Sequence, residues 1–186
     1  MENKKIIGIT GRSGVGKSEA CDCINDVFKI RLIDLDKVGH QVLTISHMKY
    51  MLKDAFGESI FENDEINRKA LGDIVFNSEE KLKELNELVH PEIKEFVKTE
   101  IQESEDRDII ITGALIKEIG LWDLCHSVVV IDAEDEEIEK RIGEKVRVHQ
   151  YQMSREEFKS QGDVVITNKF DDFFYESCIE EMKKLL

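Results

Sequence analysis

Eight residues near the start of the chain constrain its fold more than any others. Residues 11–18 read Gly-Arg-Ser-Gly-Val-Gly-Lys-Ser and match the phosphate-loop pattern G-x-x-x-x-G-K-[ST] without a mismatch. The apolar run Lys5–Thr10 before the loop predicts a strand, and apolar residues at helical spacing from Ala20 to Phe28 predict a helix after it. Such a unit presents backbone N–H groups to an anion at the positive end of the helix. We therefore expect the chain to bind a nucleoside triphosphate.

Two side chains of the motif carry its chemistry. Lys17 can reach the β- and γ-phosphates as a point charge, and the hydroxyl of Ser18 can ligate Mg²⁺. The expected ligands are therefore ATP and Mg²⁺. The alternative is a glycine-rich turn that only packs a helix on a strand.

Short apolar runs alternate with longer helical patterns along the chain. Continuous apolar runs are typical of strands covered on both faces, as in a parallel sheet with crossover helices. Besides the first strand, four runs fit this description: Lys29–Asp34, Asp108–Thr112, Ser127–Asp132 and Asp163–Thr167. The pattern predicts an α/β protein with a three-layer P-loop NTPase fold and a five-stranded parallel sheet.

Two insertions are expected to interrupt this nucleotide-binding core, which comprises residues 1–36 and 106–186. Residues 37–105 show helical patterns and no convincing strand, so they are interpreted as a helical insertion for the acceptor substrate. Within it, His90-Pro91 is expected to separate two helices, because proline cannot continue the first one. Residues 143–162 are expected to form a short lid.

Composition excludes several classes of protein. The 186 residues include 40 Asp and Glu against 26 Lys and Arg, a formal net charge of −14, which argues against a surface for nucleic acid or anionic membrane. No apolar run approaches the roughly 20 residues of a membrane span, and no secretory signal is evident. The four cysteines are too scattered for a disulfide framework, and the histidines lack zinc-ligand spacing. A cytoplasmic protein, monomeric or weakly homo-oligomeric, is expected.

Two carboxylates follow the second predicted strand. Strand alternation would place Asp34 and Asp36 on the same side, at the carboxyl edge that also holds the phosphate loop. A carboxylate there can accept the proton of an acceptor hydroxyl or hold the metal through water. The alternative role is capping of the helix that follows.

Beyond these features, the sequence resembles the dephospho-coenzyme A kinase family along most of its length. The P-loop is common to many families, whereas an ordered series of motifs is more specific. The series comprises Ile33-Asp-x-Asp36 with His40 close behind, Asn67-Arg68-x-Ala70-Leu71, Leu88-x-His90-Pro91-x-Ile93, Val129-Val-Ile-Asp132, Arg141, Gln152-Met153, Arg155-Glu-Glu157 and Ile166-x-Asn168.

The resemblance implies transfer of the γ-phosphoryl group of ATP to the ribose 3′-hydroxyl of dephospho-coenzyme A. Asp36 would be the base, and Lys17 and Arg141 would act on the transferring phosphates, with Asn168 beside adenine. The residues implied for ATP binding are Gly11, Arg12, Ser13, Gly14, Val15, Gly16, Lys17, Ser18, Glu19, Arg141 and Asn168. The acceptor would meet Asp36, His40, Arg68 and His90, with Arg147 or Arg155 from the lid on the phosphates.

Alternative roles remain open for several of these residues. Arg68 could be a solvated surface charge, His90 could orient a break between two helices, and Arg155 could pair with nearby Glu residues. The chain also departs from the family: Thr112 and Ala114 replace an Asp and a Pro after the third long strand, and the lid is shorter. Arg12-Ser13 and Asn168-Lys-Phe170 are further departures. A nucleoside or nucleotide kinase, or an ATP-binding regulator with weakened catalysis, is therefore the alternative function.

Overall fold

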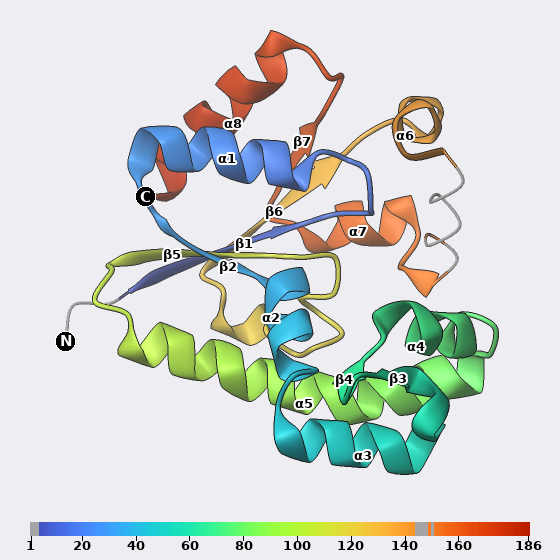
Figure 1. The fold of residues 1–186 in the computed structure, drawn as a ribbon. Helices are drawn as coiled ribbons and strands as arrows, with labels where there is room; N and C mark the ends of the chain where they lie inside the picture. Colours follow the sequence, from blue (N-terminus) through green and yellow to red (C-terminus); the bar gives the residue numbers. More distant parts are fainter. Residues whose placement is uncertain (1–3, 144–148, 150) are drawn as a thin grey trace. The chain divides into compact units, whose positions relative to one another are not determined.

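The computed structural model describes residues 4–143, 149 and 151–186, and its main sheet has five parallel strands (Figure 1). The strand order is β2-β5-β1-β6-β7. These strands are β1 (Lys5–Thr10), β2 (Arg31–Asp34), β5 (Asp108–Thr112), β6 (Ser127–Asp132) and β7 (Val164–Thr167). Because the three central strands are almost entirely buried, they show the continuous apolar character from which they were predicted. The predicted α/β fold with a five-stranded parallel sheet is confirmed.

The first strand leads through the phosphate loop into α1 (Lys17–Phe28), which packs beside the last helix, α8 (Asp172–Leu185). Both helices cover one face of the sheet (Figure 1). Ile24 of α1 and Cys178 of α8 are buried in one core cluster with Ile7 and Ile9 of β1. This packing fixes the start of α1 relative to the ends of the strands.

Three further helical segments belong to the same part of the chain. A 3₁₀ turn, η2 (Trp122–Leu124), precedes β6, and α6 (Asp135–Ile142) follows β6. The helix α7 (Arg155–Gln161) contacts β6 and lies in the segment interpreted as a lid. Residues 144–148 and 150 of that segment, including Arg147, lie outside the described residues.

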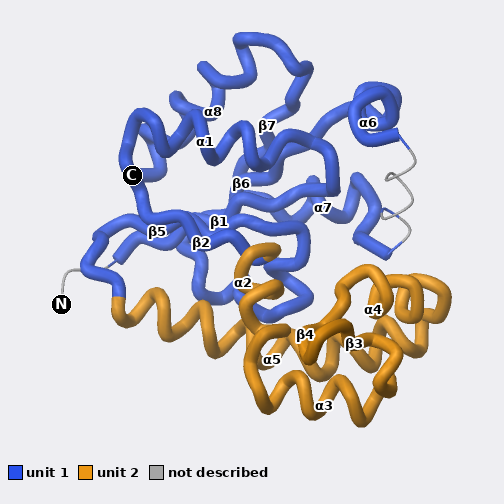
Figure 2. The backbone as a smooth tube through the Cα atoms, viewed as in Figure 1, with its two compact units in different colours: residues 1–35, 104–186 blue, residues 36–103 orange. Residues whose placement is uncertain are grey.

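The chain divides into two compact units (Figure 2). Residues 1–35 and 104–186 form the first unit, which contains the sheet, and residues 36–103 form the second. The second unit contains α2 (Leu35–Val42, whose first residue belongs to the first unit), α3 (Ser46–Phe56), η1 (Glu58–Ile60), β3 (Phe61–Glu62), β4 (Glu65–Ile66), α4 (Arg68–Val75) and α5 (Glu79–Glu103).

Two expectations for the second unit were wrong. It contains a small antiparallel hairpin, β3–β4, where no strand was expected. Its turn residues Asn63 and Asp64 both have positive φ, a backbone conformation that these residue types tolerate well. Strands of two residues are too short for an alternating pattern to appear in the sequence.

The expected break at Pro91 was also wrong, because α5 continues through it as a single helix. Proline removes one N–H from the helix ladder, which costs about 3 kcal/mol in an isolated helix. Val89, Ile93 and Val97 are buried on both sides of the proline, and α5 packs against α3 and α4. This continuous packed face stabilises the helix across the missing hydrogen bond.

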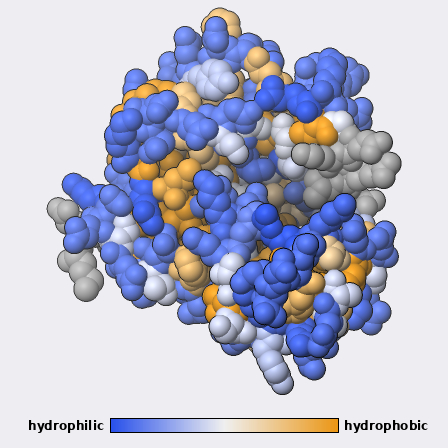
Figure 3. Space-filling model, viewed as in Figure 1, coloured by the Kyte–Doolittle hydropathy of each residue, from blue (hydrophilic) through white to orange (hydrophobic). Residues whose placement is uncertain are grey.

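The surface shown in Figure 3 is mostly hydrophilic, as the high content of charged residues leads one to expect. Hydrophilic residues cover most of the face shown in Figure 3, with apolar residues between them. Among the described helices, none has the apolar length that spanning a bilayer demands.

Candidate active site

The phosphate loop, residues 11–18, connects β1 to α1, and its glycines adopt conformations that other residues avoid. Gly11, Gly14 and Gly16 have φ values of +144°, +84° and +97°. A Cβ at Gly11 would collide with the carbonyl oxygen of Ile131, and one at Gly16 would collide with the side chain of Asn168. The loop therefore needs glycine both for its turns and for its close approach to neighbouring segments.

The start of α1 has the features of a helix N-terminus that can bind an anion. Gly16 is the N-cap residue in a left-handed conformation, and no side chain accepts a hydrogen bond there. No side-chain cap thus occupies the first N–H groups of the helix, which lie at its positive dipole end and can donate to an anion. Ser18 lies exposed in this first turn, beside Lys17.

The Lys17 side chain folds back over its own loop. Its Nζ donates hydrogen bonds to the carbonyl oxygens of Gly11 at 2.8 Å and Arg12 at 2.9 Å. These two hydrogen bonds hold the ammonium group at the loop. Phosphate oxygens, being charged, form stronger hydrogen bonds with it than carbonyl oxygens do.

The Arg12 side chain links the phosphate loop to another segment of the first unit. Its side chain is buried, and its Nη2 donates to the carbonyl oxygen of Ala133 at 3.2 Å. Its Nη1 lies 2.6 Å from Oδ1 of Asp135, the first residue of α6. The guanidinium group thereby ties the loop to the segment after β6.

Two side chains from the predicted lid contact the loop at Ser13. The backbone N–H of Ser13 donates to Oε1 of Gln152 at 3.0 Å, and the carbonyl oxygen of Ser13 lies 2.8 Å from Nε2 of His149. Gln152 belongs to a motif of the family resemblance, whereas no sequence pattern pointed to His149 as a contact of the loop. The contact is between residues more than 130 positions apart, so only the fold reveals it.

Arg155 pairs with carboxylates, as the alternative interpretation held. Its guanidinium group donates to both oxygens of Asp132, at 2.7 to 3.1 Å, and to both oxygens of Glu134, at 2.6 Å. The hydrogen bonds from Arg155 lower the pKa of Glu134 below its ordinary value. The pair with Asp132 is more than a surface contact, because that side chain is only 4% exposed.

Arg141 lies in the last turn of α6, next to the loop helix. Its Nη2 donates to Oε1 of Glu19 in α1 at 2.7 Å, and its guanidinium carbon lies 4.2 Å from the ring centroid of Phe170. The second contact is a cation–π interaction, and nothing in the sequence pointed to Phe170 as its partner. The structure thus brings Arg141, Glu19 and Phe170 together in the first unit.

Asn168 follows directly after β7 and is buried. Its Nδ2 donates to the carbonyl oxygen of Val15 at 2.9 Å, and its Oδ1 accepts from the backbone N–H of Phe170 at 2.6 Å. The side chain predicted to lie beside adenine is therefore in contact with the phosphate loop itself.

The candidate acceptor residues all belong to the second unit. Asp36 and His40 are exposed on α2, Arg68 is the exposed first residue of α4, and His90 is half-buried in the middle of α5. Asn67 is the N-cap of α4 and accepts hydrogen bonds from two backbone N–H groups. The strand-alternation argument for Asp36 was wrong, because β2 ends at Asp34 and Asp36 lies in the first turn of a helix.

Comparison with known proteins adds a second line of observation. The family model described as dephospho-CoA kinase matches residues 5–172. The chain belongs to the dephospho-CoA kinase family. A dephospho-CoA kinase from Dehalococcoides mccartyi is 31% identical over 194 residues, covering 97% of this chain and 96% of the relative. One from Lactobacillus johnsonii is 37% identical over 131 residues, covering 68% of this chain and 66% of the relative.

Solved structures share the fold of this chain. The crystal structure of TT1252 from Thermus thermophilus superposes with a TM-score of 0.84 at 25% identity, covering 99% of this chain and 98% of that one. Dephospho-CoA kinase from Campylobacter jejuni gives a TM-score of 0.71 at 23% identity, covering 98% and 97%. Shikimate kinase from Bacteroides thetaiotaomicron, with a TM-score of 0.57 at 14% identity, shares the fold. The chain therefore has the fold of a P-loop kinase.

One departure from the dephospho-CoA kinase pattern can now be described. Thr112, the last residue of β5, is buried, and so is the thiol of Cys21 in α1. Burial raises the pKa of that thiol to about 11, so it stays protonated at neutral pH. A buried, uncharged hydroxyl side chain thus stands at a strand end where the family pattern has a carboxylate.

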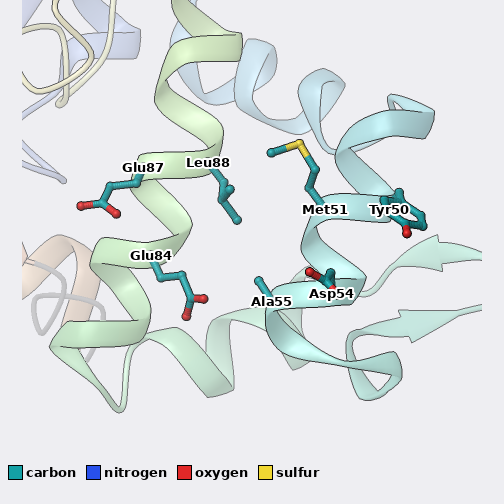
Figure 4. Close-up of a pocket in the computed structure, with 7 residues that line it drawn as sticks. All are labelled: Tyr50, Met51, Asp54, Ala55, Glu84, Glu87 and Leu88. Atoms are coloured by element: carbon teal, nitrogen blue, oxygen red, sulfur yellow. The ribbon is translucent and has the colours of Figure 1, made fainter.

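The second unit contains a pocket between α3 and α5 (Figure 4). Its volume is about 390 Å³, and it is lined by Tyr50, Met51, Asp54, Ala55, Glu84, Glu87 and Leu88. Three of the seven lining residues carry carboxylates, a lining that disfavours anionic ligands. This pocket is therefore not a phosphate-binding site.

Proposed function

We propose that this protein transfers the γ-phosphoryl group of ATP to the ribose 3′-hydroxyl of dephospho-coenzyme A, giving coenzyme A and ADP. The observation that carries the proposal is the match of the dephospho-CoA kinase family model to residues 5–172, a range that includes both the phosphate loop and the helical unit. The formed phosphate loop supports ATP as donor. The helical unit, residues 37–105 in the sequence-based division, would bind the acceptor.

The first unit would hold the donor. The N–H groups at the start of α1 bind phosphate oxygens, and Lys17 exchanges its two carbonyl partners for the β- and γ-phosphates. The guanidinium group of Arg141 is partly exposed in its pair with Glu19. It leaves Glu19 and pairs with the negative charge that develops on the transferring phosphoryl group. Phosphoryl transfer depends mainly on such positioning and charge stabilisation.

The start of α1 offers an oxygen ligand that fits Mg²⁺. The exposed hydroxyl of Ser18 would hold the ion, because it is an oxygen ligand of the kind that Mg²⁺ takes. When bound, the ion neutralises charge on the β- and γ-phosphate oxygens.

The second unit would hold the acceptor. Asp36 accepts the proton of the 3′-hydroxyl, while His40, Arg68 and His90 contact the acceptor, and Arg147 of the lid contacts the phosphates. A diphosphate-bearing acceptor needs cationic side chains, and Arg68 is an exposed cation at the start of α4. The acidic pocket between α3 and α5 does not provide them.

The test is formation of coenzyme A from ATP, Mg²⁺ and dephospho-coenzyme A. Asp36→Asn should lower kcat about 10²- to 10⁴-fold, because it removes the base, while ATP affinity by calorimetry stays unchanged. Asp54→Asn, an equivalent change on exposed α3 of the same unit, should leave kcat unaltered. If the wild-type protein binds ATP but forms no coenzyme A, the proposed acceptor is wrong.

A different acceptor is the second candidate function, and one observation favours it. The buried Thr112 offers no carboxylate at the strand end where the family pattern has one. A nucleoside or nucleotide kinase would then reveal itself in a panel of acceptors ranked by kcat/KM. ATP binding without transfer to any acceptor would instead indicate a regulatory protein.

A further inference from the structure

We propose that Asn168 is a positioning residue for the phosphate loop: its buried side-chain amide holds the Val15 carbonyl and thereby aims the next N–H group at the bound phosphates. The proposal rests on the proposed donor site and extends it to a residue whose expected place was beside adenine. It is carried by the contacts of one side chain and by the close approach of one glycine.

The amide of Asn168 is fixed in orientation. Its Oδ1 accepts from the backbone N–H of Phe170 at 2.6 Å, so Nδ2 is the atom left to face the carbonyl oxygen of Val15, at 2.9 Å. A backbone N–H has no acceptor capacity, so the opposite amide orientation would place two donors face to face. The side chain is therefore a defined donor to the loop.

The main sheet fixes the backbone position of Asn168. Asn168 directly follows Thr167, which pairs with Asp132 at the end of β6, and its backbone N–H donates to the carbonyl oxygen of Asp132 at 2.7 Å. The residue is only 3% exposed. A side chain so enclosed and bonded at both polar atoms has little surface left for a nucleotide base.

The consequence for the loop follows from the planarity of the peptide bond. In a trans peptide, the C=O of Val15 and the N–H of Gly16 point in opposite directions. When Asn168 holds the carbonyl on the core side of the loop, the N–H of Gly16 must point away from the core, where the motif binds phosphate.

Gly16, the residue after Val15, also lies close to the Asn168 amide. A Cβ on Gly16 would lie far inside normal contact distance of Nδ2 of Asn168. The loop and the amide therefore touch directly, backbone against side chain, with no room for a side chain between them. This is the close approach expected where one group sets the conformation of another.

The test compares two ligands that share phosphates and differ in the base: ATP and inorganic tripolyphosphate, each with Mg²⁺ and measured by calorimetry. Asn168→Ala leaves the buried Val15 carbonyl without its partner, and Asn168→Asp places a carboxylate oxygen against it. Both variants should bind ATP and tripolyphosphate about tenfold more weakly, by the same factor for each ligand. Asn25→Ala, the same change on the exposed face of α1, should bind both as the wild type does.

Two results would overturn the proposal. If only ATP affinity falls, Asn168 contacts the base. If the melting temperature falls while both affinities of the folded variants stay unchanged, Asn168 only stabilises the fold. Should both variants fail to fold, a crystal structure of the wild-type protein with tripolyphosphate decides, because Nδ2 must remain within hydrogen-bond distance of the Val15 oxygen. These outcomes do not depend on coenzyme A formation, so a failure of the proposed acceptor leaves them readable.

Discussion

The Lys17 side chain is held at its own loop. Its ammonium group donates hydrogen bonds to two carbonyl oxygens of that loop. In the proposed donor site, the charged oxygens of a triphosphate would accept stronger hydrogen bonds from this group than carbonyl oxygens do.

Replacing Lys17 by alanine removes this charge. We expect Lys17→Ala to lower kcat/KM for ATP about 10²- to 10³-fold, the usual effect of losing one preorganised donor to the transferring group. Steady-state kinetics with varied ATP measures the loss. Lys83→Ala, which removes a lysine from the exposed face of α5, should have no effect. Equal activity of Lys17→Ala and wild type would refute the donor site.

Arg155 carries a prediction about stability. Its removal leaves the carboxylate of Asp132, only 4% exposed, without a counter-charge. Arg155→Ala should therefore lower the free energy of unfolding by about 3 kcal/mol, whereas Lys159→Ala on the exposed face of the same helix should change it little. Urea denaturation measures both. A loss no larger than that of Lys159→Ala would show that Asp132 is stable without its partner.

Among individual residues, the sequence predicted those that belong to one contiguous motif. It did not predict side-chain pairs between segments that are far apart in the chain. The glycines, Lys17 and Ser18 follow from a contiguous pattern. The pairs Arg12–Asp135 and Arg141–Phe170 join segments separated by a strand, a helix or more. Such pairs depend on the strand order, which local patterns do not encode.

The helix α7 illustrates how an element secures its own start. Ser154 accepts from the backbone N–H of Glu157, while the Glu157 carboxylate accepts from the backbone N–H and hydroxyl of Ser154. This reciprocal capping box satisfies donors that the first turn would otherwise leave open. The hydrogen bonds from Ser154 lower the pKa of Glu157 below its ordinary value.

The capping box predicts a pH-dependent effect. Because the folded-state pKa of Glu157 is lowered, its contribution to stability is present above the unfolded-state pKa and is lost as pH falls through the folded-state pKa. Ser154→Ala should cost about 1 kcal/mol of unfolding free energy at neutral pH, and the difference should shrink in acid. Urea denaturation at both pH values measures this. Ser177→Ala, in the middle of α8, is the control and should show no such pH-dependent loss.

Strands and helices with long hydrophobic patterns were predicted from the sequence, and very short elements were not. The buried strands were found from continuous apolar runs, and β1 and β5 have the predicted bounds. The β3–β4 hairpin was missed because two residues carry no periodicity. At Pro91 the local rule failed, since the buried positions around it stabilise α5 across the proline.

For the whole molecule, the proposed function predicts that ATP and the acceptor bind to different units. Hydrogen exchange with Mg²⁺ and ATP should slow at the start of α1 in the first unit, because bound phosphates protect those N–H groups. Addition of dephospho-coenzyme A should slow exchange in residues 36–103, at the first turns of α2 and α4. Mass spectrometry of peptides from both units measures this. Protection by the acceptor confined to the first unit would contradict the assignment of the helical unit.

Residues 36–103 form one uninterrupted stretch of chain between β2 and β5, which are hydrogen-bonded neighbours in the sheet. Only two peptide junctions join this stretch to the rest of the protein. In the proposed function, the residues that bind ATP lie outside this stretch. Exchange of a single gene segment would then present a new alcohol to an unaltered phosphoryl donor, which would make this architecture well suited to diversification by recombination.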